Sequence, residues 1–219
     1  MSTINPLDNP KTFTKYDSAD IAFGVERLSQ QLKAAFEGVE TVNVPKAYKA
    51  VDHVLIIGMG GSSLGGHVLQ TGLSDRLKAS IDLMRGYSLP KWVNSKTLVI
   101  LSSFSGNTEE VLYAAKQAKA RGAKVMVIAS GGKLASLAKR QKYPAYIFKP
   151  GDLAKEPRLG IGFSVAGMLG LLESVGLVKI SKKEKLALVS AMIEVVDSCA
   201  LDVSEKENPA KQVAQALKG

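Results

Sequence analysis

Two short loops rich in glycine and hydroxyl side chains hold the residues of this chain that are best suited to bind a ligand. The first, residues 58–63, follows the apolar run 54–57, and the second, residues 102–108, follows the apolar run 98–101. A helix-like sequence comes after each loop, so backbone N–H groups and hydroxyls gather at a helix N-terminus, where an anion binds favourably. Two such loops at the carboxyl ends of parallel strands suggest a small ligand held by a phosphate on one side and by sugar-like hydroxyls on the other.

The second loop carries the stronger indication. Ser103, Ser105 and Thr108 are spaced so that their hydroxyls can converge in one tight turn, and such a nest can hold a phosphate without a lysine. Gly106 permits a close backbone approach, and Asn107 tolerates the left-handed conformation. Thr108 also stands where a helix N-cap is expected. A capped turn without a ligand is the alternative, but three hydroxyls with glycine and asparagine exceed what a cap needs.

The first loop also resembles nucleotide-binding patterns. The pattern that begins at Gly58 nearly satisfies the dinucleotide fingerprint, but Ser63 replaces its third glycine. Asp82 lies inside the next expected strand rather than at its end, where an acid would hold a ribose, and Arg85 after it at best suggests NADP. An NADP-binding Rossmann domain therefore stays open as an alternative. The phosphate loop of nucleotide hydrolases is excluded, because His67 stands where that loop needs a lysine.

Alternating helix and strand periods place both loops in an α/β fold. Nearly continuous apolar runs that alternate with helical patterns are typical of a parallel sheet covered on both faces. We expect a three-layer αβα sandwich with a central five-stranded parallel sheet of flavodoxin-like type, plus a C-terminal helix. The expected strands are residues 53–57, 81–84, 97–101, 124–129 and 145–148, and the expected helices are residues 21–36, 63–71, 108–121, 133–141, 161–175, 181–200 and 210–217.

Smaller local patterns complete this outline. Residues 42–44 favour a short edge strand, because two valines alternate with a polar residue. Asp17 or Ser18 can cap the first helix. Ser181 followed by Glu184 three residues later is the capping-box pattern, which predicts the start of the helix near the C-terminus.

The composition is that of an ordinary globular domain. The chain has 219 residues, of which 46% are hydrophobic and 22% charged, with a net charge of +9. This length favours one domain plus an extension. The basic residues are scattered over helix faces without interleaved aromatic residues, so no nucleic acid partner is expected, although the positive field favours an anionic small ligand. No apolar run approaches the roughly 20 residues that a membrane span needs, so no membrane partner is expected.

Cysteine usage and the N-terminus favour a cytoplasmic location. Cys199 is the single cysteine, so the chain has no disulfide framework, and a small buried side chain is the expected role of this thiol. Residues 1–6 lack the basic and apolar regions of a signal peptide.

Together, the two loops resemble those of the sugar isomerase (SIS) domain family. The runs that carry the resemblance are Gly58-Met59-Gly60-Gly61-Ser62 and Ser103-Phe104-Ser105-Gly106-Asn107-Thr108. Glu156-Pro157-Arg158 before an apolar helix extends the resemblance to the bifunctional phosphoglucose/phosphomannose isomerases. The resemblance covers about residues 20–219. Members of that family have two SIS domains in one chain and form dimers.

The resemblance implies a role for each site residue. The implied phosphate-binding residues are Ser103, Ser105, Gly106, Asn107 and Thr108, the implied sugar-binding residues are Gly60, Gly61 and Ser62, and the implied catalytic residue is Arg158. Enzymes of this family interconvert glucose 6-phosphate or mannose 6-phosphate with fructose 6-phosphate, and the resemblance implies no metal or organic cofactor. A non-catalytic, regulatory SIS module that binds a phosphosugar is a further alternative.

The resemblance also implies that this chain holds only part of the machinery. The family's general-base glutamate and ring-opening histidine lie in its second SIS domain. We therefore expect residues 1–180 to form a SIS domain with an N-terminal helix, and residues 181–219 to form a crossing helix and the start of a second SIS domain. The chain is expected to bind sugar phosphate but to be inactive alone.

A homodimer is the expected assembly. The crossing helix carries an apolar stripe that a second domain would cover, and such a stripe favours self-association. The residues of this stripe are Leu186, Val189, Met192 and Val196.

Overall fold

The centre of the molecule is a five-stranded sheet in which all neighbouring strands are parallel. The computed structural model describes residues 5–217. The strands are β1 (His53–Ile57), β2 (Ser80–Met84), β3 (Thr97–Ser103), β4 (Lys124–Ala129) and β5 (Ala145–Ile147), in the order β2-β1-β3-β4-β5. The chain leaves β1 for β2 on one side and then returns to place β3 on the other. The carboxyl ends of β1 and β3 therefore form the topological switch point, where ligands bind in open α/β sheets.

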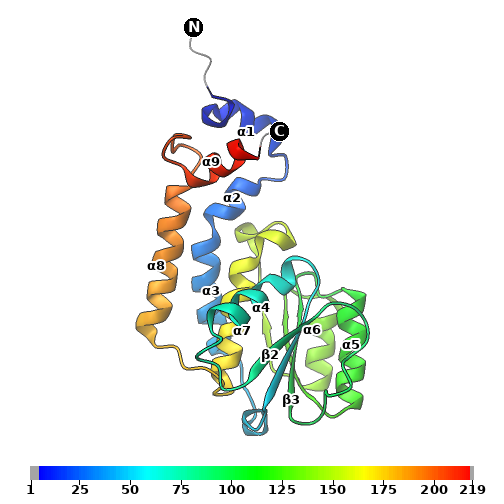
Figure 1. Cartoon of the computed structure of the whole chain (residues 1–219). Helices are drawn as coiled ribbons and strands as arrows, with labels where there is room; N and C mark the ends of the chain where they lie inside the picture. The colour runs from blue at the N-terminus through cyan, green and yellow to red at the C-terminus, as the bar shows by residue number, and fades with distance from the viewer. Residues whose placement is uncertain (1–4, 218–219) are drawn as a thin grey trace.

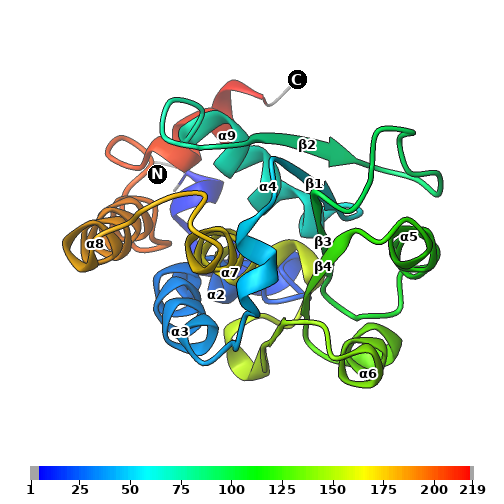
Figure 2. The same ribbon diagram turned by 90° about the horizontal axis from the view of Figure 1, so that it is seen from below.

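Helices cover both faces of this sheet (Figure 1). One face carries α3 (Leu28–Glu40), α4 (Gly61–Gly72) and α7 (Ile161–Ser174), and the other carries α5 (Glu109–Ala120) and α6 (Gly132–Gln141). The view along the sheet in Figure 2 shows the strands between these two groups of helices. The predicted three-layer αβα sandwich is confirmed.

Alternate strand residues serve the two hydrophobic cores. Val54 and Ile56 of β1 pack into the core on the α3 and α7 side, whereas Leu55 and Ile57 pack into the core under α5 and α6. All seven residues of β3, the middle strand, are buried. A strand covered on both faces needs apolar residues on both, which explains why the sequence shows continuous apolar runs.

The N-terminal region contains more helix than the sequence predicts. The additional elements are η1 (Pro6–Asp8) and α1 (Pro10–Tyr16), and the single helix expected from residue 21 is divided into α2 (Ile21–Glu26) and α3. Arg27 separates α2 from α3. No residue of α1 is buried, so α1 lacks the apolar periodicity by which helices are found. Its Asn9 cap and Pro10 at the first turn are the signals that could have revealed it.

The predicted cap of α2 comes from Asp17. Its carboxylate accepts hydrogen bonds from the N–H groups of Ile21 at 2.7 Å and Ala22 at 2.9 Å. The remaining short elements are η2 (Lys46–Lys49), η3 (Gly151–Leu153) and η4 (Pro157–Leu159).

The edge strand expected at residues 42–44 is wrong. These residues form no strand, and Val42 and Val44 are instead partly buried against the core on the α3 side. Pro45 follows, and a proline keeps the preceding residue extended without any strand partner. The alternation of apolar residues therefore reflects packing onto the core and not pairing in the sheet.

The capping box at the start of α8 (Lys182–Ser198) is confirmed. Ser181 Oγ accepts a hydrogen bond from the Glu184 N–H at 3.2 Å, and the Glu184 carboxylate accepts one from the Ser181 N–H at 2.7 Å. Arg76 Nη2 lies 2.9 Å from Glu184 Oε1. The hydrogen bonds from Ser181, with a smaller contribution from Arg76, lower the pKa of Glu184 to about 2.

This depressed pKa predicts an acid sensitivity. Because the usual pKa is 4.5, the stabilisation from Glu184 is fully present above that value and is lost as the pH falls towards 2. We expect the melting temperature of Glu184→Gln to depend less on pH in this range than that of the wild type. Glu194→Gln on the same helix is the control and should keep the wild-type pH dependence. Parallel curves for the wild type and Glu184→Gln would contradict the assignment.

The predicted apolar stripe on α8 is largely covered. Val189 and Met192 pack partly buried against the core, and Val196 is buried, because α8 runs alongside α3 (Figure 1). Leu186 is the exception, with 60% of its surface exposed. The other exposed large apolar residues of α8 are Leu188, Ile193 and Val195. The expectation of an uncovered stripe is therefore wrong for three of its four residues, and the homodimer stays a prediction.

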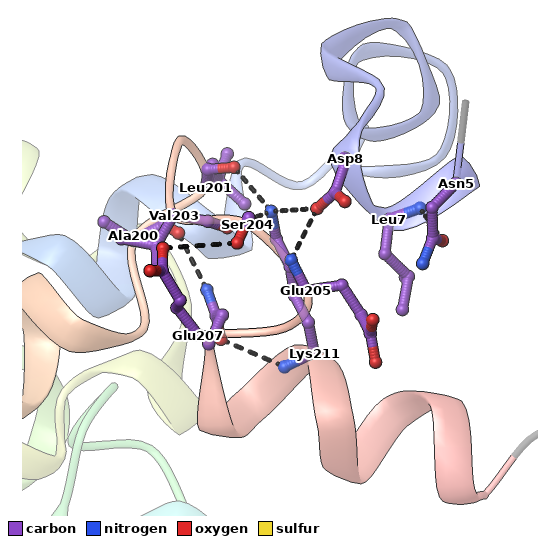
Figure 3. Close-up of polar contacts among 11 residues, drawn as sticks. Asn5, Leu7, Asp8, Ala200, Leu201, Val203, Ser204, Glu205, Glu207 and Lys211 are labelled. Carbon is purple, nitrogen blue, oxygen red and sulfur yellow. Dashed lines mark hydrogen bonds and ion pairs between the residues drawn. The ribbon is translucent and has the colours of Figure 1, made fainter. Parts of the chain in front are cut away.

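A buried lysine joins the two ends of the described chain. Lys211 of α9 (Pro209–Ala216) is only 5% exposed, and its Nζ donates hydrogen bonds to Asp8 Oδ1 at 3.2 Å, Leu201 O at 2.8 Å and Val203 O at 2.6 Å (Figure 3). Three acceptors match the three N–H donors of an ammonium group, so the buried charge is satisfied. The bond to Asp8 ties α9 to η1, and the other two tie it to the segment between α8 and α9.

The division of the chain at residue 180 stays a prediction. The outermost residues of the two predicted ranges, 1–4 and 218–219, lie outside the described residues, as do four of the six residues considered for a signal peptide. Within residues 5–217, none of the helices combines the length and apolar character needed to cross a membrane.

Candidate functional site

The two glycine- and hydroxyl-rich loops meet at the switch point between β1 and β3. Ser62 Oγ, in the first turn of α4, accepts a hydrogen bond from the Phe104 N–H at 3.0 Å. Ser102 Oγ, at the end of β3, donates to Ser62 O at 2.8 Å. Ser102 is buried, so its hydroxyl needs a partner, and the first loop supplies one. The loops are therefore in direct contact at the sheet edge where a ligand is expected.

The first loop lies against the segment that carries Arg158. Within the first loop, Gly60 is the N-cap of α4 and Gly61 is its first residue. A Cβ atom on Gly61 would lie 2.9 Å from Pro157 O and 3.0 Å from Arg158 Cα, closer than a side chain allows. Glycine at this position lets the first turn of α4 come directly against η4, which places Gly61 beside Arg158.

A buried glutamine holds the Arg158 segment in place. Gln31 of α3 is fully buried, and its Nε2 donates to Leu153 O and to Leu159 O, both at 2.8 Å. Its Oε1 accepts a hydrogen bond from the Gly162 N–H at 3.2 Å. Arg158 itself is exposed and makes no hydrogen bond or ion pair with the residues that the structure describes. Its guanidinium is therefore available to a ligand.

Asp20 ties the same segment to α2. Lys155 Nζ lies 2.7 Å from Asp20 Oδ2, and the hydrogen bond and charge of Asp20 raise the pKa of Lys155. On the other side of the site, Glu110 in the first turn of α5 raises the pKa of Tyr87, with a smaller effect of burial. The carboxylates of Asp20 and Glu110 thus lie on either side of the site, and neither belongs to the two loops.

The second loop folds into a turn built on its own hydroxyls. Ser103 Oγ accepts a hydrogen bond from the Gly106 N–H at 3.0 Å and lies 2.8 Å from Thr108 Oγ1. Ser105 Oγ accepts one from the Asn107 N–H at 3.2 Å. Ser103 is buried, whereas Ser105 and Asn107 are exposed. Thr108 occupies the N-cap position of α5, but its hydroxyl turns to Ser103 and does not cap the helix.

The second loop also binds the start of α6. Gly106 has a φ of +70°, and a Cβ atom there would overlap the carbonyl oxygen of Gly131. Gly106 O accepts a hydrogen bond from the Leu134 N–H at 2.8 Å, and Asn107 Oδ1 accepts one from the Lys133 N–H at 3.1 Å. The N-termini of α5 and α6 therefore both adjoin this turn, and their dipoles favour an anion there.

Arg85 and His67 form a group beside the first loop that the sequence did not reveal. Arg85 Nη2 lies 3.0 Å from His67 Nε2 and 3.4 Å from Ser63 Oγ. Arginine has only donors, so His67 Nε2 is the acceptor in this hydrogen bond. Arg85 directly follows β2 and the other two residues belong to α4, so only the parallel pairing of β1 with β2 brings them together. Arg85, considered above as an NADP signal, instead contacts α4.

Comparison with known proteins agrees with this geometry. Residues 48–151, which include both loops, match the SIS domain family. A bifunctional phosphoglucose/phosphomannose isomerase of Caldicellulosiruptor bescii is 35% identical over 193 residues, which cover 88% of this chain and 56% of the relative. A D-glucosamine-6-phosphate 4-epimerase of Sulfolobus acidocaldarius is 37% identical over 121 residues, which cover 55% of this chain and 38% of the relative.

A solved structure shares the fold. A crystal structure of a hypothetical protein from Thermus thermophilus superposes with a TM-score of 0.62 at 21% identity and covers 94% of this chain and 50% of that one. This chain spans about half the length of the curated relatives that it matches, 56% and 46% for the first two. The sheet order, the two joined loops and these likenesses lead to one assignment: residues 48–151 of this chain form a SIS domain.

Proposed function

We propose that this chain is the phosphosugar-binding part of an aldose–ketose isomerase that interconverts glucose 6-phosphate or mannose 6-phosphate with fructose 6-phosphate. The observation that carries this proposal is the turn of residues 103–108, in which hydroxyls and two helix N-termini surround a place for an anion at the switch point. The two relatives described above are both named for reactions of phosphorylated sugars, which supports the substrate class.

The phosphate of the substrate is assigned to the second loop. The exposed Ser105 hydroxyl, the Thr108 hydroxyl and those backbone N–H groups of the turn that are not already bonded within the two loops donate hydrogen bonds to the phosphate oxygens, and Ser103 holds the turn from below. Hydrogen bonds to a charged group are the strong kind, so a dianion is favoured over a neutral ligand. Gly106 and Asn107 fix the turn against α6.

The sugar is assigned to the space between the first loop and Arg158. The isomerisation opens the ring, moves a proton from C2 to a carboxylate base, and returns a proton to C1 of the resulting cis-enediol. Arg158 lies beside Gly61 and has no carboxylate partner among residues 5–217, so its charge can stabilise the oxygen that becomes negative in this step. We assign the base and the ring-opening histidine to the part of the enzyme beyond this chain. Cytoplasmic location and a homodimer belong to the same proposal.

The alternatives of a non-catalytic regulatory module and an NADP-binding Rossmann domain are not favoured. The match with isomerases extends over most of the chain and not only over the SIS segment. The contacts of Arg85 with His67 and Ser63 also give this residue a role without a nucleotide. A thermal shift by NADPH, with none by fructose 6-phosphate, would reverse this preference.

Ser105→Ala tests the phosphate assignment. We expect the variant to bind inorganic phosphate and fructose 6-phosphate more weakly by about 1.5–3 kcal/mol, the range for a hydrogen bond to a charged group. Isothermal calorimetry of both ligands measures this loss. The control is Ser198→Ala, which removes a hydroxyl that donates to a backbone carbonyl within α8 and lies outside the two loops. If the wild type binds neither ligand, the proposed function is wrong; if the variant matches the wild type, only the role of Ser105 is wrong.

A further inference from the structure

One buried hydroxyl near the site has no hydrogen-bond partner. Ser164 lies in the first turn of α7 and is 6% exposed. Among residues 5–217, its Oγ is the only buried side-chain nitrogen or oxygen without a partner. An unsatisfied buried hydroxyl costs about 1–3 kcal/mol, so a group of this kind needs an explanation.

Ser164 lines a narrow pocket that opens at the candidate site. Gly61, Ser62 and Pro157 are partly or fully exposed at its mouth, whereas Ile128 and Phe148 are buried inside. The complete lining is Gly61, Ser62, Ser102, Phe104, Ile128, Phe148, Pro157, Gly160 and Ser164. The pocket volume of about 10 Å³ is close to what one water-sized group needs.

The other walls of the pocket offer no free polar group of this kind. The three inner side chains Phe104, Ile128 and Phe148 are apolar, and the rings of Phe104 and Phe148 pack edge to face at 5.4 Å between centroids. The hydroxyls of Ser62 and Ser102 already bond to the Phe104 N–H and to Ser62 O. Of the three hydroxyls in the lining, only that of Ser164 makes no hydrogen bond, so all of its hydrogen-bonding capacity is left for a polar group that enters the pocket.

We propose that Ser164 is a sugar-recognition residue that binds one hydroxyl group of the sugar phosphate in this pocket. This inference rests on the proposed function. The mouth of the pocket is formed by the sugar-binding loop and the Arg158 segment, and the phosphate turn contributes only Phe104, so the bound group belongs to the sugar and not to the phosphate. A hydroxyl is the right size, and Ser164 can donate to it or accept from it.

The test compares Ser164→Ala with the wild type for two ligands. We expect the dissociation constant for fructose 6-phosphate to rise about 2- to 12-fold, the equivalent of one neutral hydrogen bond, with no change for inorganic phosphate. The melting temperature should not fall, because the substitution removes no hydrogen bond within the protein. Ser174→Ala on the same helix is the matched control, since its hydroxyl donates to Leu171 O and lies outside the pocket lining.

A series of deoxy analogues identifies the hydroxyl involved. Fructose 6-phosphate analogues that lack single hydroxyls are titrated against the wild type and Ser164→Ala, as in a double-mutant cycle. For one analogue, the two proteins should bind with equal affinity, because the contact is already absent.

Each other outcome overturns the inference. An equal loss for phosphate and sugar phosphate would indicate a structural role, and unchanged affinity for both would show that Ser164 does not contact the ligand. A loss that persists through the whole deoxy series would exclude a direct sugar contact. Failure of the wild type to bind either ligand would instead contradict the proposed function, so the two failures are distinguishable.

Discussion

Gly106→Ala is expected to weaken phosphate binding at least about 100-fold, because several hydrogen bonds of about 1.5–3 kcal/mol each to a charged ligand are lost together. Two costs act at this position. The φ of +70° is unfavourable for any residue with a Cβ atom, by about 1–2 kcal/mol. The added methyl group would also overlap Gly131 O, so the turn and the start of α6 must move apart. This movement breaks the bond from the Leu134 N–H to Gly106 O and displaces the hydroxyls of Ser105 and Thr108.

Gly122→Ala separates these two costs. Gly122 has a φ of +69°, nearly that of Gly106, but a Cβ atom there would meet only Ser95 Cβ at 3.9 Å. The control variant therefore carries the conformational cost of about 1–2 kcal/mol and keeps the phosphate turn intact. Calorimetric titration with inorganic phosphate and thermal unfolding of both variants make the comparison. Wild-type phosphate affinity in Gly106→Ala would show that the turn is not the phosphate site.

The second loop could be predicted from the sequence because its chemistry is local. Ser103, Ser105 and Thr108 lie within six residues, and the turn needs no distant segment to bring their hydroxyls together. The need for glycine at residue 106 also follows from local geometry. What the sequence does not show is why that turn is rigid: the start of α6, about 25 residues later, closes it through Leu134 and Lys133.

The residues that the sequence did not reveal make contacts with residues far away along the chain. Gln31 holds the Arg158 segment across more than 120 positions, and in the sequence it is an ordinary polar residue of an amphipathic helix. Its position beside Leu32 on the buried face of α3 was the available signal, since a buried amide needs partners. Ser164 is hidden in the same way among the apolar residues of α7.

The sheet was predictable for a different reason. Two buried faces require apolar residues at every strand position, and that pattern is visible without knowing the partners of a strand. The same reasoning failed at residues 42–44, because alternate valines also satisfy packing on a core when no strand is near. The covered face of α8 could not be foreseen either, since Val189 and Met192 find their cover on α3 and not on another domain.

The 219-residue chain alone is expected to isomerise sugar phosphate at least about 10²- to 10⁴-fold more slowly than a full-length relative, the usual contribution of a general base. The proposed site supplies the turn of residues 103–108 for the phosphate and the cation Arg158 for the developing negative charge. No carboxylate of residues 5–217 lies among the residues that line the pocket beside it. The lining therefore supplies no carboxylate to accept the proton at C2, and an open cleft leaves the enediolate in contact with water, which weakens its electrostatic stabilisation by Arg158.

A coupled assay decides this point. Fructose 6-phosphate is supplied, and glucose 6-phosphate is detected through its dehydrogenase, with the Caldicellulosiruptor bescii isomerase as the active control. Calorimetry on the same sample must show fructose 6-phosphate binding, so that a lack of turnover cannot result from a misfolded chain. Binding without turnover is the expected result, because residues 103–108 form the whole proposed phosphate turn, whereas the proposed base lies outside this chain. Robust turnover by this chain would place the base within it. The base would then be the carboxylate whose conversion to the amide abolishes the activity.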